Sequence, residues 1–317
     1  INNNLEIGSG GNGTVGGTCL FNQSGGTLHV GGEYRVANYN IASVATNNIS
    51  GNAVLIVDNW LAVGRAGGVG TLNISGNASI TKTGVGGNIT LSGDNGGTSL
   101  GTINQNGGTL TNTATETWVA ENYNGYWNLN TGADVLGVIH LTENYGAQGI
   151  FNLNGGDLTA TEITDNPGSG GAPGGSGTLN LNGGTLHAGA DTLNFMHDIN
   201  GGVYVQAGGA IINTEGYDAT IAQSLNDGSA GSGNLTKEGN GTLTLSGQNY
   251  YTGSTTISGG TLATTTGSFA VGAYTVADNA GFGVIVAYLN AQFYPASVTL
   301  GTSAGASLDF DLGAYGN

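Results

Sequence analysis

Acidic side chains are the residues whose spacing first suggests chemistry. Glu121 and Glu143 each begin a Glu-Asn-Tyr tripeptide and stand about 22 residues apart, an interval typical of the repeat unit of a solenoid. In a chain that winds back on itself at that interval, the two carboxylates would stack about 4.8 Å apart, the spacing of neighbouring strands. Either a bound Ca²⁺ ion or splayed, solvated side chains relieves the repulsion between them. We expect the splayed arrangement and no cofactor, with Ca²⁺ at Glu121 and Glu143 as the one metal candidate.

The other titratable residues give no recognisable catalytic or metal site. Asp309 and Asp311 alternate onto one face, which favours a solvated strand over a hydrolase pair. The four histidines show neither the spacing of metal ligands nor that of a catalytic triad, so we predict that they are surface residues: His29, His140, His187 and His197.

The element that must position all these residues is a degenerate repeat, apolar-Asn-x-(Asn/Ser)-Gly, whose clearest copy is residues 151–158. Its first Asn recurs at intervals of about 25 residues, with Val205 and Thr256 filling the same position further on. The anchors are Asn22, Asn48, Asn73, Asn104, Asn128, Asn152 and Asn180.

Each repeat predicts short strands joined by glycine corners. Phe151 and Leu153 flank Asn152 with a period of two, which indicates a strand, and the glycine pair after it favours a sharp turn. About 24 residues at roughly 3.3 Å each close a circuit of three strands. Stacked circuits make an all-β parallel β-helix of about 24–26 residues per coil. We expect one such domain over residues 1–317, with a protruding Gly/Pro loop at 165–177.

Charge and composition exclude several classes of function. Four basic residues stand against twenty acidic ones, a net charge of −16, so nucleic acid is not an expected partner. The longest apolar run, residues 284–289, is too short to span a bilayer. A single cysteine, Cys19, excludes an internal disulfide. The sequence begins at Ile1 without Met or signal peptide, so we expect a processed product or a fragment.

One stretch resembles a known family. Residues 234–262, which contain Thr242-Leu243-Thr244-Leu245-Ser246-Gly247 and Tyr251-Thr252-Gly253, resemble the autotransporter-associated β-strand repeat of bacterial autotransporter passengers. The resemblance implies a right-handed parallel β-helix, exported from a Gram-negative-type bacterium and located outside the cell or on its surface.

An enzyme that acts on polysaccharides is the class to weigh against this, because lyases and hydrolases share the β-helix scaffold. Such lyases generally need an Arg or Lys base beside clustered acids, and the four basic residues do not stand with an acidic cluster in the sequence: Arg35, Arg65, Lys82 and Lys237. Hydrolases need carboxylates opposed across a groove, which no spacing here suggests. We therefore predict no catalytic residues.

The two ends of the chain suggest self-assembly. Leu5 and Ile7 lie in a strand-like opening stretch, and Leu308, Phe310 and Leu312 lie in a strand-like closing one, with no helix or charged cap beside either. Strands at the two ends of the solenoid would have unpaired edges, and one copy can pair with the next through them, head to tail, to build a filament. We expect a structural fibre subunit whose partner is itself. The alternatives are a single adhesin stalk that binds glycans or surfaces and, second, a polysaccharide-acting enzyme.

Overall fold

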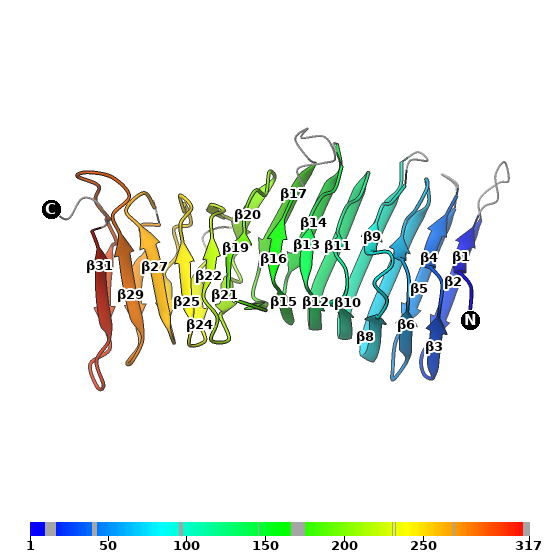
Figure 1. The fold of residues 1–317 in the computed structure, drawn as a ribbon, viewed down its shortest axis with the longest axis horizontal. Coiled ribbons are helices and arrows are strands. Elements are labelled where there is room, and N and C mark those ends of the chain that lie inside the picture. Colours follow the sequence, from blue (N-terminus) through cyan, green and yellow to red (C-terminus); the bar gives the residue numbers. More distant parts are fainter. Residues whose placement is uncertain are drawn as a thin grey trace.

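The computed structural model describes residues 1–9, 17–39, 43–94, 98–144, 146–165, 175–229, 231, 233–268 and 270–312. These residues form 31 strands and no helix. The strands lie side by side along the long axis of the molecule, and the first and last strands, β1 and β31, lie at opposite ends (Figure 1). The predicted parallel β-solenoid is therefore confirmed, with about 25 residues in each turn. No helix in the described part of the chain is long and apolar enough to cross a membrane.

Three parallel ladders form the sides of the solenoid, and we call them walls. Wall 1 is a continuous sheet of 13 strands that runs the full length of the described chain. Its members are β1 (Leu5–Ser9), β4 (Tyr34–Asn38), β7 (Leu61–Val63), β9 (Ile89–Leu91), β11 (Thr117–Trp118), β13 (Val138–His140), β16 (Glu162–Thr164), β19 (Thr192–Met196), β22 (Ala219–Ile221), β25 (Thr242–Leu245), β27 (Thr261–Thr265), β29 (Gly281–Ile285) and β31 (Ser307–Asp311).

Wall 2 carries the predicted asparagine anchors and is shorter. It consists of β2 (Thr18–Gln23), β5 (Val44–Ile49), the first halves of β8 (Val69–Lys82), β10 (Leu100–Asn112) and β12 (Asn124–Leu136), then β14 (Gln148–Leu153), β17 (Ser176–Leu181), β20 (Gly202–Val205) and β23 (Leu225–Asp227).

Wall 3 follows wall 2 around a corner, and β8, β10 and β12 bend through that corner without a break. Its members are β3 (Thr27–Val30), β6 (Val54–Val57), the second halves of those three strands, β15 (Asp157–Ala160), β18 (Thr185–Ala188), β21 (Ala210–Asn213), β24 (Leu235–Glu238), β26 (Thr255–Ile257), β28 (Ala273–Val276) and β30 (Ser297–Leu300).

The core fills the tube with columns of apolar side chains, because alternate residues of each strand point inward. Trp127 of wall 2 is fully buried, as its position predicts, and stacks on Phe151 of the next coil with ring centroids 5.5 Å apart. Glycine is required at the wall 2–wall 3 corner. Gly108 has φ +71°, and a Cβ there would lie 2.3 Å from the Ala78 carbonyl oxygen of the coil below.

Two repeat positions were predicted wrongly. Tyr204, not Val205, pairs with Asn180, so Val205 points into the core, and Thr256 belongs to wall 3. The Val205 error is a shift of one residue within a coil of ordinary length, whereas the Thr256 error arises because coil length is not constant. Leu243 pairs directly with Leu262, so this coil is shorter than the average turn, because among the described residues wall 2 has no strand beyond β23 and the coil loses one side.

Candidate functional site

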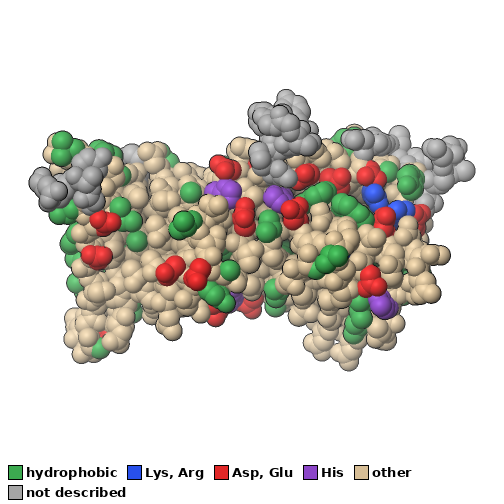
Figure 2. All heavy atoms as spheres, in the orientation of Figure 1, with side chains coloured by type: hydrophobic (Ala, Val, Ile, Leu, Met, Phe, Trp, Pro, Cys, Tyr) green, Lys and Arg blue, Asp and Glu red, His purple; other side chains and the backbone are tan. Residues whose placement is uncertain are grey.

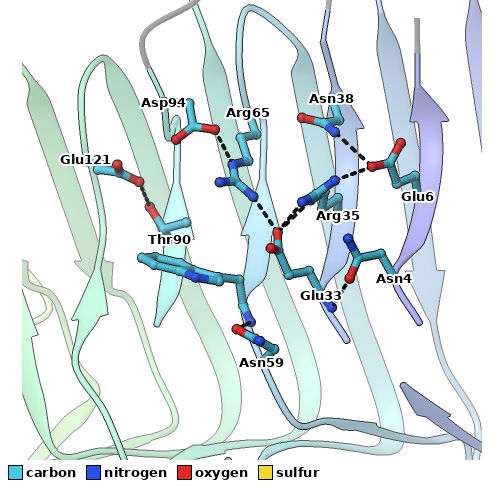
Figure 3. A network of polar contacts seen from close by, with 11 residues as sticks. Asn4, Glu6, Glu33, Arg35, Asn38, Asn59, Arg65, Thr90, Asp94 and Glu121 are labelled. Atoms are coloured by element: carbon cyan, nitrogen blue, oxygen red, sulfur yellow. Dashed lines mark hydrogen bonds and ion pairs between the residues drawn. The ribbon is translucent and has the colours of Figure 1, made fainter. Parts of the chain in front are cut away.

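The most developed polar cluster lies on the outer surface of wall 1, over the first four coils. We call it the Arg–Glu network, and it consists of Glu6, Glu33, Arg35, Arg65 and Asp94 (Figure 3). Glu33 contacts both arginines, with its Oε2 2.6 Å from Arg35 Nη2 and 2.5 Å from Arg65 Nη1. Arg35 also pairs with Glu6, and Arg65 Nε lies 2.6 Å from Asp94 Oδ2. The network therefore ties each of these coils to the next.

Both guanidinium groups are held by carboxylates on two sides. The side chains of Arg35 and Arg65 are only 10% and 16% exposed, and Arg65 also lies over the Trp60 ring, 5.9 Å from its centroid. An arginine held between two carboxylates remains protonated and cannot act as a base. The network can therefore link coils, and its two arginines do not serve as bases.

The network corrects the expectation that no basic residue stands with an acidic cluster. Arg35 follows Glu6 by 29 residues and Asp94 follows Arg65 by 29 residues, so stacking one coil on the next brings each pair together. The sequence contained this signal as a one-coil spacing between opposite charges. A search for neighbouring charges along the chain could not find it. In the view of Figure 2 the basic side chains lie near the N-terminal end, beside acidic ones.

The structure brings Glu121 and Glu143 into register on adjacent coils, since their neighbours Trp118 and His140 pair. Glu121 already accepts a hydrogen bond from the Thr90 hydroxyl at 2.8 Å. Burial raises the pKa of Glu121, and the nearby Asp94 charge adds to that effect. The described residues contain no group of three or more His, Cys, Asp or Glu arranged to hold a metal ion. Calcium at these two glutamates stays a prediction.

The histidines differ from the expectation of simple surface residues, because each contacts a carboxylate. Three have side chains that are only 11–21% exposed, and His197 lies between Glu162 (3.1 Å) and Asp198 (2.9 Å). Burial lowers the pKa of His197, but the hydrogen bonds and charges of those two carboxylates outweigh it and raise the pKa. The remaining pairs are His29–Asp58, His140–Glu116, and His187 with Asp157 and Glu215.

The residues predicted to mediate assembly differ in exposure between the two described ends. At the N-terminal end Ile7 is only 4% exposed and Leu5 is half-buried. At the C-terminal end Leu308, Phe310 and Leu312 are 43%, 60% and 51% exposed. Leu308 and Phe310 line an apolar cavity of about 340 Å³ that also includes Phe282 and Phe293. The predicted assembly role of these residues stays a prediction.

Other predicted features can be placed only in part. Residues 166–174 of the predicted loop lie outside the described residues. At the base of that loop the buried Asp165 accepts hydrogen bonds from the backbone N–H groups of Gly177 (3.0 Å) and Asn200 (2.9 Å). Asp309 and Asp311 lie on the exposed strand β31, which pairs with β29.

Sequence reasoning missed the buried lysine Lys237, which lies in the column of inward-facing residues of wall 3, between Ile212 and Ile257. Its side chain is fully buried, and its Nζ donates to the carbonyl oxygens of Glu238 (2.7 Å), Gly239 (2.8 Å) and Gly259 (3.1 Å). Burial lowers the pKa of Lys237 to about 8. The lysine thus closes a corner by satisfying three carbonyl groups from two coils.

Lys237 lies within the segment that matches a known family. No curated protein and no solved structure matches the chain significantly. Residues 235–263 match the family model of the passenger-associated-transport-repeat, over β24, β25, β26 and the start of β27. This segment begins where wall 2 has ended and the coils shorten. The chain is therefore a parallel β-solenoid that carries a passenger-associated-transport-repeat and is consistent with an autotransporter passenger.

Proposed function

We propose that this chain is a non-enzymatic structural β-solenoid that serves as a rigid rod on a bacterial surface or in the extracellular space. The observation that carries the proposal is the unbroken parallel ladder of wall 1, from β1 to β31. Thirteen strands at about 4.8 Å give a rod roughly 58 Å long. The passenger-associated-transport-repeat supports the location, because it is a repeat of exported passengers.

The non-enzymatic part of the proposal rests on how the polar groups are used. The two arginines of the Arg–Glu network are held by carboxylates on both sides. Both ring nitrogens of His197 contact carboxylates, so neither is free to accept a proton from a substrate. Polysaccharide turnover that is lost in Glu121→Gln or Asp309→Asn would contradict this part of the proposal.

Head-to-tail assembly into a fibre is the second candidate, and the exposed apolar C-terminal end favours it. Stacking would place β1 of one copy on β31 of the next and β3 on β30. Two features oppose a seamless joint. The N-terminal end has three walls and the C-terminal end has two, so β2 would meet no strand. Aligning Leu5 and Ile7 with Leu308 and Phe310 would also set Glu6 against Asp309, and like charges repel.

Electron microscopy and sedimentation velocity of the purified chain distinguish the two candidates. Isolated rods about 58 Å long, with a sedimentation coefficient that does not change with concentration, support the rod. Filaments support the fibre, provided that Phe310→Asp abolishes them. Leu193→Asp is the matched control, because Leu193 is 81% exposed but lies on wall 1 in β19, away from both ends.

A further inference from the structure

The outer surface of wall 2 is uncharged from β2 to β20, although the chain carries 20 acidic residues. Outward positions on these eight strands hold only Thr, Asn, Ser, Gln, Gly and apolar or tyrosine side chains, as in Val69, Thr71 and Asn73 of β8. We call this surface the neutral strip. It contrasts with the outer surface of wall 1, where the Arg–Glu network and the carboxylate-paired His140 lie.

An asparagine ladder runs the length of the neutral strip. The Nδ2 of each Asn donates to the Oδ1 of the Asn one coil earlier, at 2.7–3.0 Å, and Gln206 Nε2 donates to Asn180 Oδ1 at 2.7 Å. A second ladder, at the edge of the strip, joins Asn106, Asn130, Asn154 and Asn182 at 2.9–3.1 Å. The asparagine side chains of the strip are thus held in place before any ligand arrives.

Each ladder amide keeps part of its bonding capacity. An Asn side chain has two N–H donors and an oxygen with two lone pairs, and a central ladder member uses one of each within the ladder. One donor and one lone pair therefore remain at every coil, repeated about every 4.8 Å. The neighbouring outward column mixes hydroxyl and apolar groups: Leu20, Thr46, Thr71, Thr102, Tyr126, Ile150 and Thr178.

The size and chemistry of the strip select its ligand. Measured between the outermost residues, three outward columns on eight strands cover about 13 Å by about 34 Å, roughly 450 Å², which is below the ~800 Å² per partner of a specific protein interface. The strip is long and narrow, so it suits one extended polymer chain. Hydroxyl groups both donate and accept, as the amides require, and sugar C–H faces can pack on Tyr126 and Ile150. The strip has no cation for an acidic polymer, which the net charge of −16 would also repel.

We infer that the neutral strip binds a single chain of a neutral polysaccharide that lies along the solenoid axis. This inference rests on the proposed function, which places the rod outside the cell where such polymers occur. Binding needs no rearrangement of the protein, because the ladder already fixes the amides, and this lowers its entropic cost. Because the contact involves no ion pair, its strength does not depend on ionic strength.

The test measures retention of the full chain on insoluble neutral polysaccharides, a β-glucan and chitin, at low and high salt, with polygalacturonate as the acidic comparison. The variant Tyr126→Ala/Ile150→Ala removes apolar contacts from two adjacent coils of the strip. We expect binding at least about tenfold weaker than that of the unmodified chain. The control Leu193→Ala/Tyr217→Ala removes similar exposed side chains outside the strip and should bind normally.

A second variant guards against a folding defect in the first. Thr102→Glu places a charge between Thr71 and Tyr126 without touching the core, and it should also weaken binding while the melting curve stays unchanged. The inference is overturned if no neutral polysaccharide retains the chain, if the strip variants bind as well as the control, or if retention occurs only on polygalacturonate. These outcomes leave the rod itself untouched, so they are distinct from failure of the proposed function.

Discussion

A charged residue in the apolar core provides a sharp test of how this solenoid is stabilised. Asp134 lies in the inward column of wall 3, where it pairs with Leu110 and Leu158, and it is 1% exposed. Its Oδ1 accepts a hydrogen bond from the Leu110 N–H at 3.2 Å, whereas its Oδ2 has no partner of normal geometry among the described residues. Burial raises the pKa of Asp134 from 3.8 to about 7, although Gln105, Leu110 and Trp127 each offset part of the effect.

The pKa shift converts into a pH-dependent stability. The carboxyl group binds its proton more tightly in the folded state, so its contribution to stability is fully present below pH 3.8 and is lost as the pH rises to about 7. The shift of roughly three pKa units corresponds to about 4 kcal/mol. The variant Asp134→Asn keeps the shape and an acceptor for the Leu110 N–H but cannot ionise. It should match the unmodified chain near pH 3.5 and exceed its stability by about 4 kcal/mol at pH 8.

Urea unfolding of both proteins from pH 3.5 to pH 9 measures this difference. Other titrating groups are common to the two proteins, so the difference in unfolding free energy isolates Asp134. It should grow by about 1.4 kcal/mol per pH unit between pH 4 and pH 7 and then level off. The control Asp309→Asn removes an exposed carboxylate on β31 and should change stability little. A difference for Asp134→Asn that is the same at every pH would refute the reasoning.

Three further predictions test the cross-coil contacts. Glu33→Gln removes the carboxylate shared by two arginines and should cost about 2 kcal/mol in urea unfolding, somewhat less than breaking a fully buried pair; a cost near zero would show that the network does not stabilise the fold. Asn152→Ala breaks two ladder bonds and should cost about 1–3 kcal/mol, which an unchanged melting temperature would disprove. A chelator should leave the melting temperature unchanged, because Glu121 and Glu143 offer too few ligands for Ca²⁺. If the chelator lowers the melting temperature, and Glu143→Gln lowers it equally without the chelator, a bound metal ion is established.

Much of the fold follows from local sequence rules, because the same short sequence pattern forms the same turn in every coil. All seven predicted asparagine anchors, from Asn22 to Asn180, stack in one hydrogen-bonded ladder. Glycine pairs after the strands mark corners such as Gly107–Gly108, where a side chain would collide with the coil below. The prediction of this position failed beyond Asn180. Val205 is one residue past the partner of Asn180, and Thr256 lies where wall 2 has ended and the coil is shorter.

The candidate site was much harder to predict, since its contacts depend on register between coils. The pairing of Arg35 with Glu6 requires a coil of 29 residues and that of Arg65 with Asp94 a coil of 28 residues, and both coils are longer than the one that the repeat predicts. Asp134 has the alternating position of a core residue, but nothing in the local sequence shows that Leu110 and Leu158 stack directly on it. Local sequence patterns therefore predict the walls. Predicting side-chain contacts between coils also requires the number of residues at every corner.

The distance between Thr27 and Thr299 tests the central claim, a single rod of coils stacked in register. Both residues face outward from wall 3, at the two ends of one column of eleven strand spacings. Spin labels at these two positions, on a Cys19→Ser background, report the distance by pulsed electron paramagnetic resonance. We expect one narrow distribution centred at about 53 Å, eleven times the strand spacing. A broad distribution, or one centred far from that distance, would contradict it.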